Sequence, residues 1–348
     1  MARALAHGDG DAMPMAKRGR WLGRALTVLA ASASALPALA EEAASPGVLT
    51  FILENDIFAG FDEQYTNGAF LRYSPSPGAL PQWALFAREQ MSGFVHADTW
   101  RVTYGLGQAM FAPNDITLRD PPLDDRPYAG YLFGTVALSA DTGTRLDTVA
   151  LDLGVVGPPS LAEQAQKLVH NFIGDDPKGW DTQLGTEVAF RVVYEQSHKI
   201  GATLGPEFWG LEVDAIPQAT VALGTVDTSL TGALTLRAGR SLDMDYGPPR
   251  VRRSLAGFAA VDKQSPEGWY VFASAEGRLV GRNLFLDGNT FRDSRSVDSE
   301  LFVPELAAGA ALRLRGAMLT YSHVFRAPEF ETRNGWTQFG SLSLQIPF

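Results

Sequence analysis

Several side chains in this sequence are of the types that bind calcium or move a proton. They lie in four short segments: Glu54-Asn55-Asp56, Tyr65-Thr66-Asn67-Gly68, Asp124-Asp125-Arg126, and His170 with Asp175 and Asp176. Carboxylate, amide and hydroxyl oxygens are hard ligands that suit Ca²⁺, and an imidazole beside them could take a proton from water for attack on an ester. Asp-rich loops are usually solvated turns, so the hypothesis of a site depends on a fold that brings these segments together.

A helix is predicted around His170. Ser160 and Glu163 form a capping box, and Gly174 is a natural end for the helix. The apolar positions follow helical spacing: Leu161, Ala165, Leu168, Val169, Phe172 and Ile173. At about 100° per residue, His170 lies roughly 140° from the centre of this stripe. Periodicity alone therefore indicates a solvated surface histidine.

The segments that must position these residues alternate apolar with small or polar residues at a period of two, which is typical of a transmembrane barrel. We expect strands near residues 48–55, 66–74, 100–110, 128–140, 145–156, 185–197, 206–225, 229–241, 269–281, 300–315, 316–327 and 336–348. The predicted fold is all-β: an antiparallel up-and-down transmembrane β-barrel of about twelve strands, an even number as bacterial single-chain barrels require. The seventh segment is long and contains Pro217, so eleven to fourteen strands remain open. The alternative, a soluble periplasmic β-sandwich, would have strands nearer five or six residues.

The amino-acid composition excludes several further classes of protein and site. The chain has 348 residues, with 29 Lys+Arg against 39 Asp+Glu and no cysteine. This excludes disulfide scaffolds and thiolate metal sites, and the acidic balance argues against nucleic acid as a partner. After residue 40 no apolar run reaches the roughly 18–20 residues of a spanning helix. Outward aromatic residues, such as Tyr128 and Tyr131 or Trp269 and Phe272, are expected on the lipid-facing wall.

Residues 1–40 are predicted to be a signal peptide, and residues 41–348 the outer-membrane barrel domain. Lys17, Arg18, Arg20 and Arg24 precede an apolar stretch that ends in Ala38-Leu39-Ala40, so cleavage is expected after Ala40. An N-terminal anchor helix is the alternative, but the apolar stretch is too short to span a bilayer. The last strand ends at Phe348, which is typical of chains handled by the barrel assembly machinery.

Strand parity assigns each connection to a side if both chain ends lie in the periplasm. The four chemical segments then all fall at the extracellular end of the barrel. Two periplasmic links, 75–99 and 242–268, are long. A short helix is expected within residues 81–94, whereas Gly247-Pro248-Pro249-Arg250 fits no strand.

The order and spacing of several motifs resemble the lipid A 3′-O-deacylase (LpxR) family of outer-membrane enzymes. The matching motifs are Glu54-Asn55-Asp56, Tyr65-Thr66-Asn67-Gly68, Asp125-Arg126-Pro127-Tyr128-Ala129-Gly130, Gly154-Val155-Val156-Gly157-Pro158, Gln166-Lys167-Leu168-Val169-His170, Ile173-Gly174 and Lys178-Gly179-Trp180-Asp181. The resemblance implies a twelve-stranded barrel with its active site between the wall and the loop helix, facing the cell exterior. It also implies Ca²⁺-dependent removal of the 3′ acyloxyacyl group from lipid A in lipopolysaccharide.

The resemblance also implies roles for single residues. His170 matches the family's general base, Asn55 and Asp56 match an active-site pair, and Thr66 matches a site threonine. The expected metal ligands are Asp56 and Asp176, with Asp175 as the alternative to the latter. A family lysine in the second extracellular loop has no counterpart in residues 111–127, where Arg119 or Arg126 are the available cations.

Two other functions fit the same barrel. One is a phospholipase or another esterase acting on outer-leaflet lipids, although the sequence contains no Gly-x-Ser-x-Gly elbow. The other is a structural barrel or a small pore without activity, although twelve strands leave little open space for a channel.

Overall fold

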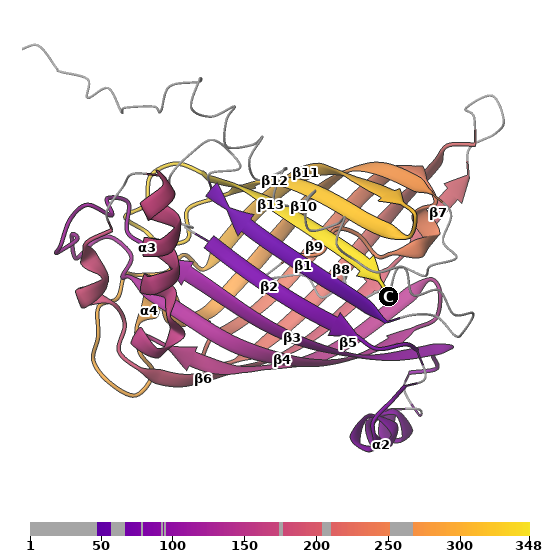
Figure 1. The fold of residues 1–348 in the computed structure, drawn as a ribbon, viewed down its shortest axis with the longest axis horizontal. Coiled ribbons are helices and arrows are strands. Elements are labelled where there is room, and N and C mark those ends of the chain that lie inside the picture. Colours follow the sequence, from indigo (N-terminus) through magenta and orange to yellow (C-terminus); the bar gives the residue numbers. More distant parts are fainter. Residues whose placement is uncertain are drawn as a thin grey trace, which may run out of the picture. The chain divides into compact units, whose positions relative to one another are not determined.

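The computed structural model describes residues 47–56, 67–77, 79–91, 93, 95–173, 177–203, 210–250 and 267–348, without the side chains of residues 67, 169–173 and 244. These residues form a closed antiparallel barrel of twelve wall strands (Figure 1), which confirms the predicted fold class. The predicted signal peptide and its cleavage site lie outside the described residues. Among the described helices, none is both long and apolar enough to cross a membrane.

The strands follow the expected segments closely. They are β1 (Val48–Asn55), β2 (Asn67–Ser74), β3 (Thr99–Phe111), β4 (Ala129–Asp141), β5 (Arg145–Val156), β6 (Glu187–His198), β7 (Ile200–Thr203), β8 (Glu212–Gly224), β9 (Asp227–Arg240), β10 (Gly268–Asn283), β11 (Phe302–Leu314), β12 (Ala317–Arg326) and β13 (Thr337–Pro347). Each strand pairs with its neighbours along the chain, except that β6 and β7 do not pair with each other; β1 also pairs with β13, and β6 with β8. These last two pairings close the ring.

The four-residue β7 continues β6 rather than adding a wall position. Ser197 pairs with Gln218 and Ile200 with Ala215, so both strands share one register against β8. In that register His198 lies opposite Pro217, which has no N–H to donate to the ladder. Pro217 therefore interrupts the strand that pairs with β8, between β6 and β7. Strand β8 itself runs unbroken through Pro217.

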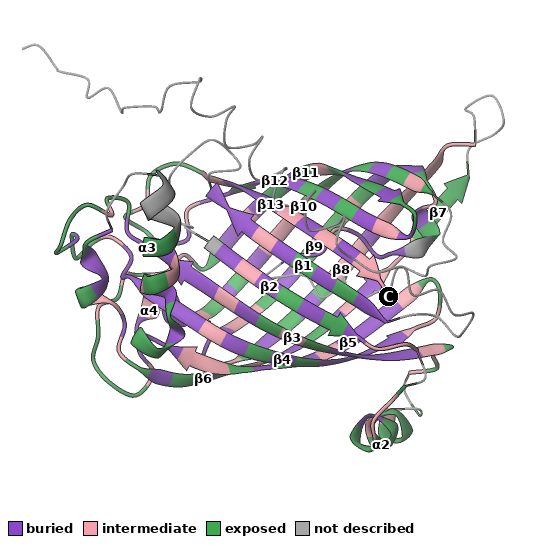
Figure 2. Ribbon diagram, viewed as in Figure 1, coloured by how far each residue is buried: buried purple, intermediate pink, exposed green. Residues whose placement is uncertain are grey.

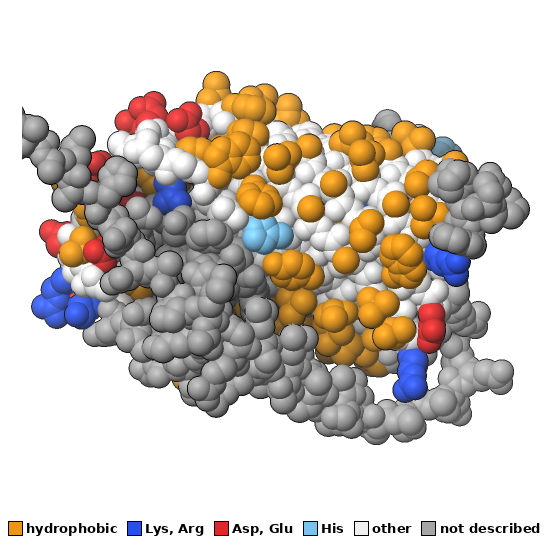
Figure 3. All heavy atoms as spheres, turned by 90° about the horizontal axis from the view of Figure 1, so that it is seen from above, with side chains coloured by type: hydrophobic (Ala, Val, Ile, Leu, Met, Phe, Trp, Pro, Cys, Tyr) orange, Lys and Arg blue, Asp and Glu red, His pale blue; other side chains and the backbone are white. Residues whose placement is uncertain are grey.

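Alternate residues along each strand face outward and inward, which gives the alternating exposure along the strands of Figure 2. The visible wall carries scattered hydrophobic side chains, with charged groups gathered toward its two ends (Figure 3). Trp269 faces outward as expected, but Tyr131 and Phe272 are buried and face inward. The two residues of each expected pair, Tyr128 with Tyr131 and Trp269 with Phe272, are three positions apart. Such residues cannot share a face of a strand, because side chains along a strand alternate with a period of two.

Two helices identify the two ends of the barrel. At one end, here called the α3 end, lie α3 (Ala162–Ile173), α4 (Leu284–Asp287) and the 3₁₀ turns η2 (Pro158–Ser160) and η3 (Gly179–Thr182). The opposite α2 end carries α2 (Gln82–Met91) and η5 (Leu242–Met244). Strand parity and Figure 1 place the links after β1, β3, β5, β8, β10 and β12 at the α3 end.

Both ends of the interior are filled by chain segments. At the α3 end, Phe285 of α4 stacks on the inward-facing Phe111, with ring centroids 4.4 Å apart. From the α2 end, the segment that follows η5 runs into the barrel as far as Arg250. The Arg250 guanidinium forms ion pairs with Glu54 at 3.1 Å and Glu305 at 3.0 Å. The segment that fitted no strand is therefore part of the interior packing.

Candidate active site

The last residues of β1 bring one part of the predicted site to the α3 end. Asn55 lies on the outward-facing side of β1, the side of Leu49 and Phe51, yet it is only 8 % exposed. Asp56 follows directly and is 1 % exposed. Glu54 faces the other way, into the interior, where it binds Arg250. Within this motif, Asn55 and Asp56 are thus the residues available to a site at the rim, whereas Glu54 holds the barrel together.

The other predicted residues are placed only in part. His170 belongs to α3, at the same end of the barrel as Asn55 and Asp56, and its side chain lies outside the described residues. Thr66, Asp175 and Asp176 lie outside them as well. Among the described residues, no three His, Cys, Asp or Glu side chains come together as a metal site. The fold therefore brings α3 and the end of β1 to one rim, and the ligand set remains a prediction.

A tight turn directs the chain from the wall into α3. Gly157 has a φ of 89°, a conformation that favours glycine, and a Cβ there would lie 2.8 Å from the Leu184 carbonyl oxygen. Leu161 is left-handed, with a φ of 59°. The predicted capping box does not form, because Ser160 belongs to the 3₁₀ turn, and its buried Oγ has no hydrogen-bond partner among the described residues. Glu163 pairs instead with Lys167 at 2.6 Å.

Helix α3 packs against the outside of the wall, over β3 and β4. Gly130 makes this close approach possible, because a Cβ at that position would lie 2.1 Å from Ser160 Oγ and 2.3 Å from Ala162 Cβ. Gln108, on the outward side of β3, donates from Nε2 to the Ser160 carbonyl oxygen at 2.7 Å. These contacts fix the start of the helix on the surface that faces lipid.

A second set of contacts fixes the middle of the helix. Trp180 of η3 donates from Nε1 to Gln166 Oε1 at 2.6 Å, and its ring packs on Tyr128 with centroids 4.8 Å apart. The sequence motifs contain Gly130, Gln166 and Trp180, but motif spacing did not indicate that they hold α3. The one signal for this packing in the sequence was Gly130, a glycine at an outward-facing position of a predicted strand.

The buried face of α3 differs from the predicted apolar stripe. Ala162 and Gln166 are 1 % exposed, whereas Leu161 and Leu168 are 54 % and 63 % exposed. The helix is thus turned so that part of its apolar stripe stays uncovered. Position 170 follows Gln166 by four residues, and positions four apart share a helix face.

The loop between β3 and β4 contains two arginines, of which one is buried and one is exposed. Arg126 is 2 % exposed, lies 3.6 Å from Glu329 and stacks over Phe111, and burial lowers its pKa. Asp125 accepts hydrogen bonds from the backbone of Asn114 and Arg126 at 2.7 Å. Arg126 therefore cannot replace the family lysine at the surface. Arg119, which is exposed, remains the available candidate in this loop.

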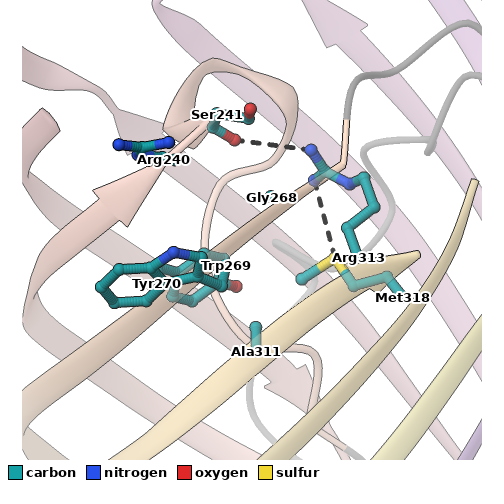
Figure 4. A pocket seen from close by; sticks show the side chains of 8 residues that line it. All are labelled: Arg240, Ser241, Gly268, Trp269, Tyr270, Ala311, Arg313 and Met318. Carbon is teal, nitrogen blue, oxygen red and sulfur yellow. Dashed lines mark hydrogen bonds between the residues drawn. The ribbon is translucent and has the colours of Figure 1, made fainter. Parts of the chain in front are cut away.

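The described residues also line a small pocket at the opposite end (Figure 4). It lies between β9, β10, β11 and β12 and has a volume of about 10 Å³, which is about enough for one water molecule. Arg313 borders it and donates to the Ser241 carbonyl oxygen at 3.4 Å. This pocket is too small for a lipid and has no part in the candidate site.

Comparisons with known proteins agree with this geometry. The family model described as "Outer membrane protein LpxR" matches residues 26–348. The solved structure of LpxR from Salmonella typhimurium is 20 % identical, with a TM-score of 0.69 over 86 % of this chain and 100 % of that chain. The β-domain of the Bordetella autotransporter BrkA is 11 % identical, with a TM-score of 0.43 over 88 % of this chain and all of its own. No protein with curated function matches the sequence.

Proposed function

The chain belongs to the LpxR family of outer-membrane proteins, and we propose that it hydrolyses the ester that links the 3′ acyloxyacyl group to lipid A. The family assignment supports a protein that modifies lipid A in the outer membrane. The proposal adds the bond that is cleaved, the residues that cleave it and the side of the membrane on which they act. In this proposal the α3 end faces the cell exterior, where lipopolysaccharide forms the leaflet.

One observation carries the proposal: α3 is clamped to the outside of the wall rather than over the barrel lumen. A site between this helix and β1 would be open to the bilayer from the side. The substrate could then keep its acyl chains in lipid while its polar part reaches the rim. The exposed Leu161 and Leu168 give α3 an apolar surface that suits such chains.

In the proposed reaction, His170 takes a proton from a water molecule, and the water attacks the ester carbonyl. Asn55 would orient the reacting group from the end of β1, and Thr66 would add a hydroxyl contact. Trp180 and Gln166 would keep the helix, and with it position 170, at a fixed distance from the wall. The proton returns to the leaving alcohol from the same imidazole.

The donor chemistry at the rim fits Ca²⁺. Asp56 supplies a carboxylate at a buried position, Asn55 an amide oxygen beside it, and the chain contains no thiolate that would favour zinc. We propose Asp56 and Asp176 as the residues that hold the ion. When bound, Ca²⁺ supplies positive charge that offsets repulsion between these carboxylates and stabilises a developing oxyanion.

Mass spectrometry of lipid A tests the proposal. Cells that express the protein should lose the 3′ acyloxyacyl group, whereas cells that express His170→Ala should retain it. His198→Ala is the matched control, because His198 lies on the wall near the α2 end and binds Gln196 at 3.1 Å, away from α3. Loss of phospholipid acyl chains with intact lipid A would favour the phospholipase alternative. An active His170→Ala variant would contradict the role of this histidine.

A further inference from the structure

Helix α2 lies against the outside of the barrel wall. Its Ala84 is fully buried in a cluster with Trp100, Val102, Leu138 and Ala140, each 7 % exposed or less. These four residues occupy outward-facing positions of β3 and β4, so the helix covers wall that would otherwise face lipid. Figure 1 shows α2 beside the wall, outside the barrel.

The part of α2 that does not touch the wall has an aromatic flank formed by Trp83 and Phe86. These side chains are 44 % and 64 % exposed, although both are large and apolar. They stand three positions apart and therefore lie on the same flank of the helix. Arg88, Glu89 and Gln90 supply exposed polar side chains on the same helix. At about 100° per residue, Arg88 lies on the side of α2 opposite the aromatic flank, whereas Gln90 lies on the flank and Glu89 beside Phe86.

The register of β3 and β4 gives the position of α2 along the barrel axis relative to α3. Trp100 pairs with Ala140 under α2, and Met110 pairs with Gly130 under α3. The ten residues from Trp100 to Met110 correspond to about 26 Å along the barrel axis, at about 3.4 Å per residue and a strand tilt of about 40°. The apolar band of outer-membrane barrels is about 25 Å tall. The two helices therefore lie at its opposite boundaries.

Lipid-facing wall fills the interval between the two helices. Tyr104, Leu106 and Val136 lie there and are 37 %, 59 % and 39 % exposed. The aromatic flank continues this apolar surface at the boundary nearest the α2 end. Trp and Phe with neighbouring polar residues are typical of helices that lie in the interface plane of a bilayer.

We propose that α2 is a membrane-surface helix whose aromatic flank inserts at the boundary between headgroups and acyl chains of the phospholipid leaflet around the α2 end. The occupant of this surface is phospholipid, because the flank adjoins wall that already faces lipid. The inference rests on the proposed orientation of the barrel, with the α3 end outside, but not on the proposed reaction.

Spin labels can test the position of α2, because the chain has no cysteine of its own. Single variants Trp83→Cys, Phe86→Cys and Arg88→Cys are labelled and reconstituted in vesicles of phosphatidylethanolamine and phosphatidylglycerol. Leu106→Cys is the lipid-facing reference. Collision rates with oxygen and with a water-soluble nickel complex report whether each label lies in lipid or in water.

The ratio of oxygen to nickel collisions should be several-fold higher at residues 83 and 86 than at residue 88, and close to the ratio at residue 106. Equal ratios at residues 86 and 88 would overturn the proposal. The vesicles contain only this protein and lipid, so a water-exposed flank would mean that phospholipid does not cover it. Heat-modifiable migration on a gel confirms that each variant is a folded barrel before it is measured.

Discussion

At the residue scale, Glu54, Asn55 and Asp56 show how consecutive side chains take up different tasks. The strand period of two turns Glu54 inward and Asn55 outward. Glu54 becomes part of an interior ion-pair network, while Asn55 and Asp56 stay at the rim. The sequence motif alone presents the three as one polar group, and only the strand register separates them.

Replacing Asp56 by Asn should raise the Ca²⁺ concentration needed for half-maximal deacylation, because the variant loses one charged oxygen ligand. Asp120→Asn is the control, since Asp120 is an exposed carboxylate of the same end, paired with Arg295 at 3.3 Å. The measurement is lipid A hydrolysis by purified protein over a calcium titration after chelation. Full activity of the wild type in excess chelator would remove calcium from the mechanism.

At the element scale, the position of α3 depends on the absence of a side chain at Gly130. Replacing Gly130 by Ala places a methyl group where Ser160 and Ala162 now lie, so the start of α3 must move away from the wall. We expect activity to fall by an order of magnitude or more, about 1.4 kcal/mol or above in barrier height. Barrel assembly should continue, because the strand hydrogen bonds do not involve the side chain.

Gly134→Ala is the matched control for this change. Gly134 also lies outward on β4, but an added Cβ there would meet only the Gly105 carbonyl oxygen among the described residues, at an ordinary 3.9 Å. Lipid A hydrolysis and heat-modifiable migration are measured for both variants. Equal activity of the two would mean that close seating of α3 is unnecessary for turnover.

The sequence predicted the strands well because each wall strand repeats one simple pattern of alternation. The start of α3 was harder to predict. A left-handed Leu161 ends the 3₁₀ turn, and so Ser160 caps nothing despite its favourable spacing from Glu163. The buried face was also mispredicted, because packing on Gly130 selected small and amide side chains over the leucines. Arg250 could not be placed at all, since its partners Glu54 and Glu305 are distant in the chain.

At the scale of the whole molecule, the barrel is a packed body whose described interior is filled from both ends. Phe285 enters from the α3 end and the segment to Arg250 from the α2 end. Burial alone would lower the pKa of Arg250, but Glu305 and Glu54 raise it above its ordinary value, so the guanidinium stays charged. This arrangement disfavours the pore alternative.

Planar bilayers with the purified protein should therefore show no stable channel conductance. The described segments that enter the interior from both ends occupy the space that an aqueous path would need, and Arg250 there is held in ion pairs. Single-channel recording at high salt checks this, with a general porin as the positive control. Reproducible unitary conductance would restore the pore as a function.

Replacing Arg250 by Leu should lower the free energy of unfolding at neutral pH by about 3 kcal/mol, because it leaves buried carboxylates without one cation. Arg295→Leu, which breaks the exposed pair with Asp120, should cost about 1 kcal/mol or less. Equilibrium unfolding in urea at neutral pH distinguishes the variants, and equal deficits would contradict a structural role for Arg250.

Arg250 can reach its place most readily while the barrel is still open. Its partners lie on β1, the first strand of the chain, and on β11, close to the last. Passage through a filled and closed interior would strip the guanidinium of water before any carboxylate could compensate it. The segment is therefore expected to be inside when β1 and β13 meet. The segment would then hold the two edges of the sheet, β1 and β13, in register while they pair. Its loss would therefore slow assembly more than it would alter the finished fold.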